Sequence, residues 1–171
     1  MNQTANLFTG TVEADETYIG GKRKGKAGRG AAGKTPVIGI LERGGNIVAK
    51  ATPDVSSKSL VTNIAKNVSL SATVMTDEWN GYSPLSKIGF EHKTIKHKDG
   101  HYVDGDIHTN GIESFWAQLK RSINGTFHHV SGKHLPKYLN EFVYRHNHRH
   151  SETPMFSRLI GTAGERRDSA V

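Results

Sequence analysis

The sequence predicts an α/β fold in which a mixed sheet is flanked by helices. Short runs with the period-two or continuous apolar pattern of strands are interspersed with longer segments whose apolar residues recur at helical spacing. The chain has 171 residues, a length that suits a single domain with one modest core. We expect a loose lead-in over residues 1–9, the domain over residues 10–150, and a C-terminal tail over residues 151–171.

The first expected strand covers residues 10–19, where apolar and polar side chains alternate. The stretch that follows, residues 20–35, is rich in Gly, Lys and Arg and cannot bury apolar surface, so we expect a flexible basic loop. The alternation of the strand places Val12, Ala14 and Tyr18 on one face and Glu13, Asp15 and Thr17 on the other.

A hairpin is expected next, because apolar runs at residues 37–41 and 47–51 surround the turn signal Arg43-Gly44-Gly45-Asn46. A helix follows, with Ser56 or Ser57 as its N-cap and an apolar stripe at helical spacing. The members of that stripe are Leu60, Val61, Ile64, Ala65 and Val68.

Later segments complete the pattern. Residues 73–76 predict a short strand that ends at Asp77, residues 90–95 a further strand, and residues 96–107 a polar loop. Two helices close the domain: Ser131 is the candidate cap of the second, and its Pro136 suits only the first turn. Their apolar stripes are Ile112, Phe115, Trp116, Leu119 and Ile123, then Leu135, Tyr138, Leu139, Phe142 and Val143.

This order, three strands, a helix and a strand that pairs beside the first, is a ribonuclease-H-like arrangement. It brings the ends of the first and fourth strands together, and with them Asp15 and Asp77. Glu113 would join them from a helix that packs across the sheet. Carboxylates are the ligands that Mg²⁺ prefers, and two such ions can activate an attacking oxygen and stabilise a leaving one.

Other readings of these acids stay open. Asn110 is a candidate cap of the helix, which would make Glu113 part of a capping box. Glu13 shares a strand face with Asp15 and is either a minor ligand or a solvated side chain, whereas Glu16 points the other way. Lys120 lies seven residues after Glu113, on the same side of the helix, where it could hold a DNA phosphate.

Several phrases of the chain are specific when taken together and in order. They are VEADETYIGGKRKGK, VMTDEWNGY, HTNGIESFWAQLKR and GTFHHVSGKHLPKYLNEFVYRHNHR. Over about residues 10–150 the chain resembles the IS1595-like transposases, whose catalytic domain is called ISXO2-like. The resemblance implies a DDE-type domain with a ribonuclease-H-like fold that cleaves and joins DNA strands with Mg²⁺ or Mn²⁺ and without a covalent protein intermediate.

The resemblance also implies roles for particular residues. Asp15, Asp77 and Glu113 would be the three catalytic acids and metal ligands, and Lys120 matches the basic residue that often follows the third acid. Asn110 is the alternative for the third position, because some relatives use Asn there. Lys22, Arg23, Lys24, Lys26, Arg29, Lys120 and Arg121 are the expected DNA-binding residues.

Full transposases of this kind carry an N-terminal zinc-ribbon or helix-turn-helix region that recognises the ends of the element. Only 14 residues precede Asp15 and the chain has no Cys, so we expect end recognition to come from elsewhere or the chain to be a fragment. A non-catalytic, basic DNA-binding fragment is therefore one alternative. A P-loop nucleotide hydrolase is a weaker one, because GRGAAGKT (residues 28–35) fits the motif but precedes Pro36 and a strand-like run.

The composition agrees with a nucleic-acid partner. The net charge is +7, which favours a polyanion, here the transposon ends and target DNA. Without Cys there are no disulfides, and no apolar run approaches the roughly 20 residues that span a bilayer. Because the N-terminus lacks the pattern of a signal peptide, we expect a cytoplasmic, nucleoid-associated bacterial protein with no membrane partner. A homo-oligomer is the usual working form of such enzymes.

Overall fold

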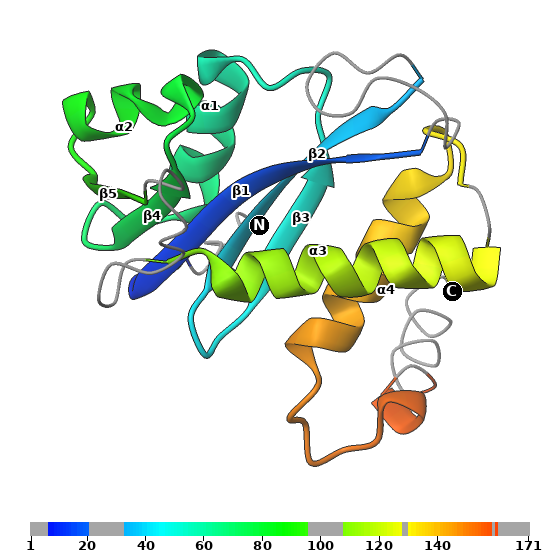
Figure 1. The fold of residues 1–171 in the computed structure, drawn as a ribbon. Coiled ribbons are helices and arrows are strands. Elements are labelled where there is room, and N and C mark those ends of the chain that lie inside the picture. The colour runs from blue at the N-terminus through cyan, green and yellow to red at the C-terminus, as the bar shows by residue number, and fades with distance from the viewer. Residues whose placement is uncertain (1–6, 21–32, 96–107, 128–129, 159, 161–171) are drawn as a thin grey trace, which may run out of the picture.

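The structure is a computed structural model that describes residues 7–20, 33–95, 108–127, 130–158 and 160. Three strands come first along the chain, and two further strands and the helices follow (Figure 1). They are β1 (Thr11–Ile19), β2 (Thr35–Glu42), β3 (Ile47–Ala51), α1 (Ser57–Asn67), β4 (Thr73–Asp77), η1 (Asn80–Tyr82), α2 (Pro84–Lys87), β5 (Glu91–Ile95), α3 (Asn110–Ser122), the π-helical turn η3 (Ile123–Phe127) and α4 (Leu135–Asn147).

The strands form one mixed sheet in the order β3-β2-β1-β4-β5. The hairpin β2–β3 is antiparallel, as is the β1–β2 pair, while β4 runs parallel to β1 and to β5. The helix α1 lies between β3 and β4 in the chain and supplies the crossover that a parallel pair needs. The predicted α/β fold with a ribonuclease-H-like mixed sheet is confirmed.

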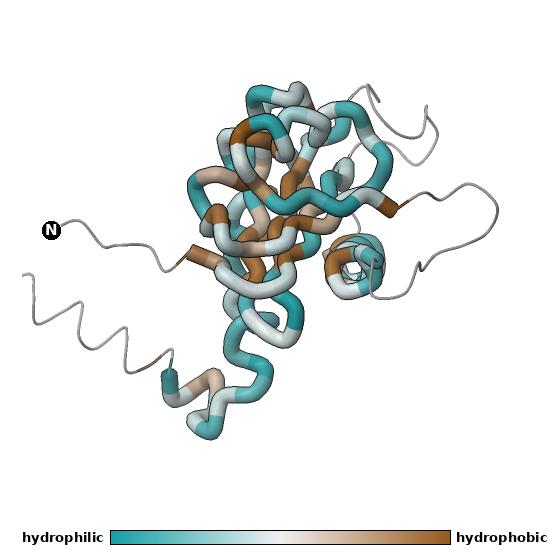
Figure 2. Tube along the Cα trace, turned by 90° about the vertical axis from the view of Figure 1, so that its left-hand side faces the viewer, coloured by the Kyte–Doolittle hydropathy of each residue, from teal (hydrophilic) through white to brown (hydrophobic). Residues whose placement is uncertain are grey.

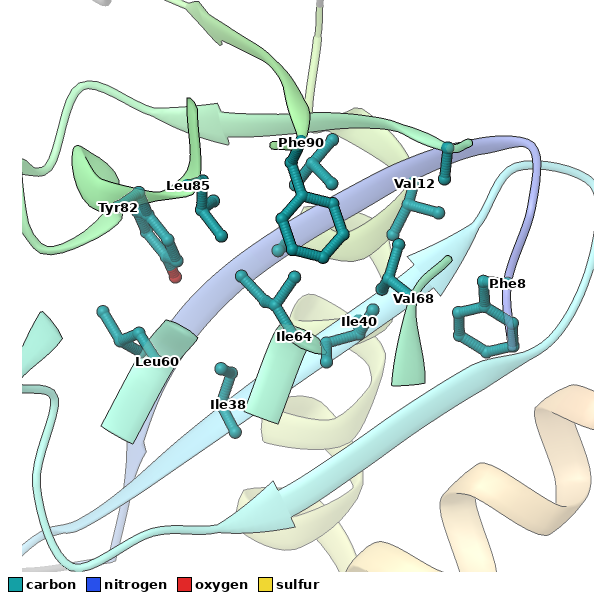
Figure 3. Close-up of a cluster of buried hydrophobic side chains, with 13 residues drawn as sticks. Phe8, Val12, Ile38, Ile40, Leu60, Ile64, Val68, Tyr82, Leu85 and Phe90 are labelled. Atoms are coloured by element: carbon teal, nitrogen blue, oxygen red, sulfur yellow. The ribbon is translucent and has the colours of Figure 1, made fainter. Parts of the chain in front are cut away.

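Each face of the sheet carries its own apolar cluster because side chains alternate along the strands. The face that α1 covers is drawn in Figure 3, and α3 and α4 cover the opposite face (Figure 1). Figure 2 looks along α3 and shows its apolar side turned to the sheet. The first cluster includes Phe8, Val12, Ala14, Ile38, Ile40, Leu60, Ile64, Val74, Tyr82, Leu85 and Phe90; the second includes Val37, Leu41, Ile47, Ile112, Phe115, Trp116, Leu119, Leu135 and Leu139.

Helix starts agree in part with the predicted caps. The hydroxyl of Ser56 accepts a hydrogen bond from the backbone N–H of Ser59 and begins α1 as expected. Pro136 lies in the first turn of α4, where a missing N–H costs nothing. Ser131 is not the cap of that helix: α4 begins at Leu135 after His134, and Ser131 instead accepts backbone bonds from both with its carbonyl.

Part of the segment before β1 packs against the domain. Phe8 is 8% exposed, pairs with Val68 in an isolated parallel bridge and packs in the apolar cluster on the face of the sheet that α1 covers. Burial of a large aromatic side chain stabilises the fold and accounts for this packing. In the part of the chain that the structure describes, no helix has the length and hydropathy needed to cross a membrane.

Several predictions fall on segments outside the described residues. These are the basic stretch from residue 21 to 32, with Lys22, Arg23, Lys24, Lys26 and Arg29, and the polar loop over residues 96–107. The end of the phosphate-loop motif is described, and there Thr35 begins β2. A phosphate loop would open a helix at this point, so the P-loop reading is wrong.

Candidate metal and nucleic-acid site

Asp15 and Asp77 come from neighbouring parallel strands and from the same face of the sheet. The register pairs Glu13 of β1 with Met75 of β4. Two residues further along each strand are Asp15 (13 + 2) and Asp77 (75 + 2), and a step of two returns to the same face. Asp77 is the last residue of β4, where its Oδ1 accepts a bond of 3.0 Å from the backbone N–H of Trp79.

Glu113 and Lys120 lie on the exposed side of α3. The buried residues of this helix are Ile112, Phe115, Trp116 and Leu119, and both charged residues fall outside that stripe, as their spacing predicted. The helix begins one residue earlier than the capping-box reading requires. Thr109 is the N-cap and Asn110 the first helical residue, and the Thr109 hydroxyl donates to Glu113 Oε1 at 2.8 Å.

The pKa of Asp15 is shifted by its burial and by neighbouring charges. Its pKa is raised from the ordinary 3.8 to about 7, first by burial and then by the negative charges of Glu16, Asp77 and Glu113, while a bond from the Glu16 backbone opposes the shift. Carboxylates from β1, β4 and α3, which are distant in the sequence, therefore act on the partly buried Asp15. Like charges collected in this way favour protonation or a bound cation.

The ammonium group of Lys120 lies within electrostatic reach of Asp15. The pKa of the Lys120 ammonium is lowered by partial burial and by the like charge of Lys34, whereas the charge of Asp15 opposes that shift. Lys34 precedes β2 and Lys120 is near the end of α3, so two elements bring positive charge to the same end of the site. Arg121, the next residue, is exposed. A phosphate that approached the carboxylates would meet these charges.

Glu13 is buried, so the prediction that it is a solvated side chain is wrong. It is 1% exposed, and its Oε1 lies 2.8 Å from Arg43 Nε and 3.3 Å from His108 Nδ1. Its Oε2 accepts the backbone N–H of Ile112 at 2.9 Å. The carboxylate therefore satisfies one of the free N–H groups at the start of α3 and fixes that end against β1.

Arg43 completes the anchor at the start of α3. Besides the pair with Glu13, its Nη2 donates to the carbonyl of His108 at 2.7 Å and contacts Met75 Sδ at 3.1 Å. Sequence reasoning treated Arg43 only as part of a hairpin turn and missed this role. The available signal was an arginine in a Gly-Gly turn opposite a strand with an inward-facing acid.

Glu16 does point to the other face, as predicted. Its Oε2 accepts the hydroxyl of the buried Tyr82 at 2.7 Å. Burial raises the pKa of that phenol well above its ordinary value, and the charges of Glu16, Asp15 and Asp77 add to the effect. Tyr82 therefore stays protonated and holds Glu16 away from the face that carries Asp15.

The donor set fits a hard divalent ion such as Mg²⁺ or Mn²⁺, since Asp15, Asp77 and Glu113 offer only oxygen. Among the residues that the structure describes, no three His, Asp or Glu side chains are grouped tightly enough to form a finished metal cage. The site thus consists of carboxylates within electrostatic reach of one another. Mg²⁺ usually takes only one or two carboxylates and completes its shell with water and phosphate oxygens, which suits such an open arrangement.

Comparison with known proteins agrees with the fold and the motifs. Residues 8–147 match the family model of the ISXO2-like transposase domain. A curated relative, described as an uncharacterized protein in transposable element ISH50 of Halobacterium salinarum, is 34% identical over 156 residues. That match covers 80% of this chain and 52% of the relative, so the chain spans about half the length of the curated relative.

A solved structure shares the fold at low sequence identity. It is a chain of the simian T-cell lymphotropic virus intasome in complex with PP2A regulatory subunit B56 gamma, determined by cryoEM. The similarity has a TM-score of 0.52 at 13% identity and covers 87% of this chain and 52% of that chain. At this identity the likeness concerns the fold alone.

Proposed function

The chain belongs to the ISXO2-like transposase domain family, and from that membership we propose that it is a divalent-metal-dependent catalytic domain that cleaves and joins DNA strands at transposon ends. Asp15, Asp77 and Glu113 would hold Mg²⁺ or Mn²⁺. The chemistry takes place on DNA in the cytoplasm, and the basic residues between positions 20 and 35 contribute to DNA binding.

The meeting of Asp15 with Asp77 on neighbouring parallel strands is the observation that supports the proposal most strongly. The negative charges of Glu16, Asp77 and Glu113 act on Asp15 there and, with its burial, raise its pKa to about 7. A domain that needed only a basic DNA-binding surface would gain nothing from repelling acids in a half-buried position, because such an arrangement lowers stability. Strained electrostatics of this kind are typical of functional sites, where a ligand relieves them.

Each residue of the candidate site has its own role in the proposed reaction. When bound, divalent ions polarise the phosphate and lower the pKa of water. Asp15 and Asp77 supply oxygen ligands from the rigid sheet, and Glu113 supplies one from α3. Lys120, on the same helix as Glu113, is within electrostatic reach of Asp15 and would neutralise a phosphate of the bound strand. Arg121, beside it, would contact the DNA backbone further along.

Nicking of supercoiled plasmid in Mn²⁺ or Mg²⁺ tests the proposal. We expect the wild-type chain to nick, and Asp15→Asn or Asp77→Asn to lower the rate by at least about 1,000-fold, the effect of losing several kcal/mol of metal-derived stabilisation. Glu141→Gln, an exposed acid of α4, is the matched control and should keep full activity. Retained nicking in either Asp variant would refute the assignment.

The third acid needs its own comparison. Asn110 and Glu113 are both exposed and lie one turn apart at the start of α3, and only Glu113 carries the charge that acts on Asp15. We therefore expect Glu113→Gln to abolish nicking and Asn110→Ala to leave most of it. The reverse result would transfer the role to Asn110.

A non-catalytic DNA-binding fragment is the second candidate, favoured by the net charge of +7. It predicts salt-sensitive DNA binding, with affinity falling steeply as salt rises, and no metal-dependent nicking. The plasmid assay separates the two candidates, because both bind DNA and only the catalytic domain cleaves it.

A further inference from the structure

Asp15 accepts a hydrogen bond from a buried aromatic side chain. Trp116 of α3 is 4% exposed, yet its indole Nε1 donates to Asp15 Oδ2 at 3.0 Å. The indole belongs to the α3-side apolar cluster, and its only polar atom is directed at a carboxylate of the candidate site. A buried indole N–H needs an acceptor, and here the acceptor is a carboxylate of the candidate site.

The indole ring can reach Asp15 because Gly39, in the strand beneath the ring, has no side chain. Gly39 of β2 is the register partner of Asp15. A Cβ placed on Gly39 would lie 2.5 and 2.7 Å from the indole atoms Cζ2 and Cη2, and 2.8 Å from Ile112 Cδ1. These distances are far below ordinary contact, so any larger residue at position 39 would displace the ring.

A second aromatic ring limits the indole on its other flank. Phe115 meets Trp116 edge-on, with ring centroids 5.3 Å apart and an interplanar angle of 64°. The bare backbone of Gly39 and the ring of Phe115 thus define where the indole lies. Its N–H then fixes Oδ2 of Asp15, and with it the plane of the carboxylate.

We propose that Trp116 is a positioning residue for Asp15 and that Gly39 leaves the space in which its indole lies. The indole N–H would hold one carboxylate oxygen of Asp15 so that the other oxygen meets the divalent cation. The inference rests on the proposed function, because it assumes that Asp15 is a ligand. Groups that orient metal ligands by hydrogen bonds typically change metal affinity about 10- to 100-fold when they are removed.

Three variants separate positioning from packing. Trp116→Phe removes the N–H and the outer ring. Gly39→Ala/Trp116→Phe adds a methyl group where the outer ring had been, so it restores part of the packing without restoring the donor. Gly39→Ala alone keeps the donor and displaces it.

The hydrogen bond itself is measured by NMR of the indole N–H groups. The chain has two Trp residues, Trp79 and Trp116, so Trp79→Phe assigns the signals. We expect the Trp116 signal to lie downfield and to exchange slowly with solvent in the wild type. It should move upfield in Asp15→Ala and in Gly39→Ala. A Trp116 indole N–H chemical shift that stays the same in both variants would overturn the proposal, and this test does not depend on catalytic activity.

The effect on the site is measured by titrating Mn²⁺ with DNA duplex present and following the free ion by EPR. Trp116→Phe and Gly39→Ala/Trp116→Phe should both bind Mn²⁺ about tenfold more weakly, and the double variant should recover thermal stability without recovering affinity. If the double variant recovers Mn²⁺ affinity together with thermal stability, or if Trp116→Phe binds Mn²⁺ as tightly as the wild type, Trp116 is only a packing residue. A wild-type chain that binds no Mn²⁺ would overturn the proposed function and this inference with it.

Discussion

Glu13 and Asp15 lie two residues apart on the same face of β1, and their surroundings are opposite. Glu13 is fully buried and meets Arg43, His108 and the N-terminus of α3. Asp15 is half-buried and meets the indole N–H of Trp116 together with the negative charges of Glu16, Asp77 and Glu113. One strand therefore carries an acid whose charge is balanced by direct partners, and an acid whose charge is left unbalanced because its surrounding charges are mainly negative.

The difference separates architecture from function. A buried charge that the fold itself neutralises fixes the position of a helix, here the one that carries Glu113 and Trp116. A charge left beside other acids costs stability and is tolerated only where a ligand compensates. The paired acid thus builds the frame in which the unbalanced acid can act.

The largest expected effect concerns the balanced acid. Glu13→Ala should lower the free energy of unfolding by about 3 kcal/mol or more, because it leaves Arg43 and the N–H of Ile112 without their buried acceptor. Urea denaturation followed by circular dichroism measures it. A loss below about 0.5 kcal/mol, the usual range of surface substitutions, would show that the anchor is unimportant.

The unbalanced acid should behave in the opposite way. Folding raises the pKa of Asp15 from 3.8 to about 7, so the folded chain holds a proton that the unfolded chain releases between these values. Without metal, this group makes the folded state progressively less stable as pH rises from 3.8 to about 7. Asp15→Asn should remove that loss and stabilise the chain at pH 8 by on the order of 2 kcal/mol.

Thermal unfolding of wild type and Asp15→Asn from pH 4 to pH 8, in chelator, checks this prediction. The difference between the two chains isolates Asp15 from the other groups that titrate. A wild type that gains stability relative to Asp15→Asn as pH rises would contradict the assigned shift.

A smaller effect is expected at the cation of the site. Lys120→Ala should weaken DNA binding and reduce the slope of log K against log salt by about one, the result of losing a single phosphate contact. Lys137→Ala, an exposed lysine of α4, is the comparison variant. Fluorescence anisotropy across a salt series measures both, and an unchanged slope for Lys120→Ala would remove it from the DNA-contacting set.

The smallest effect belongs to a pair that is balanced but exposed. Glu141 and Arg145 form an i,i+4 pair on α4, with the Arg145 Nη2 2.8 Å from Glu141 Oε1. Water screens such pairs, so Glu141→Ala should change the free energy of unfolding by less than about 0.5 kcal/mol. A change as large as that of Glu13→Ala would mean that burial does not distinguish the two acids.

The sequence predicted the sheet and the meeting of Asp15 with Asp77, because period-two alternation and strand order determine both. It did not predict the partners of Glu13 and Asp15. The contact of Arg43 with Glu13 joins a turn to a strand through a long side chain. The contact of Trp116 with Asp15 depends on the space left by Gly39, which a one-dimensional pattern does not report.

Local signals also yielded to tertiary packing at both ends of the domain. Phe8 packs into the core although most residues around it in the sequence are polar, and α4 starts after His134 rather than at the favourable Ser131. The start of α3 shows the same competition. Thr109 is the N-cap, and the buried carboxylate of Glu13, 99 positions from Ile112, satisfies a helix N–H that a local side chain would otherwise cap.

Calorimetric titration of Mn²⁺, with a DNA duplex present throughout, tests most directly whether the acids of β1, β4 and α3 form a cation site. The wild type and Asp15→Asn are compared with Glu16→Gln, which alters the neighbouring acid on the other face. We predict saturable binding in the wild type and in Glu16→Gln, and its loss in Asp15→Asn. Equal binding in the wild type and Asp15→Asn, or none in any chain, would contradict the account.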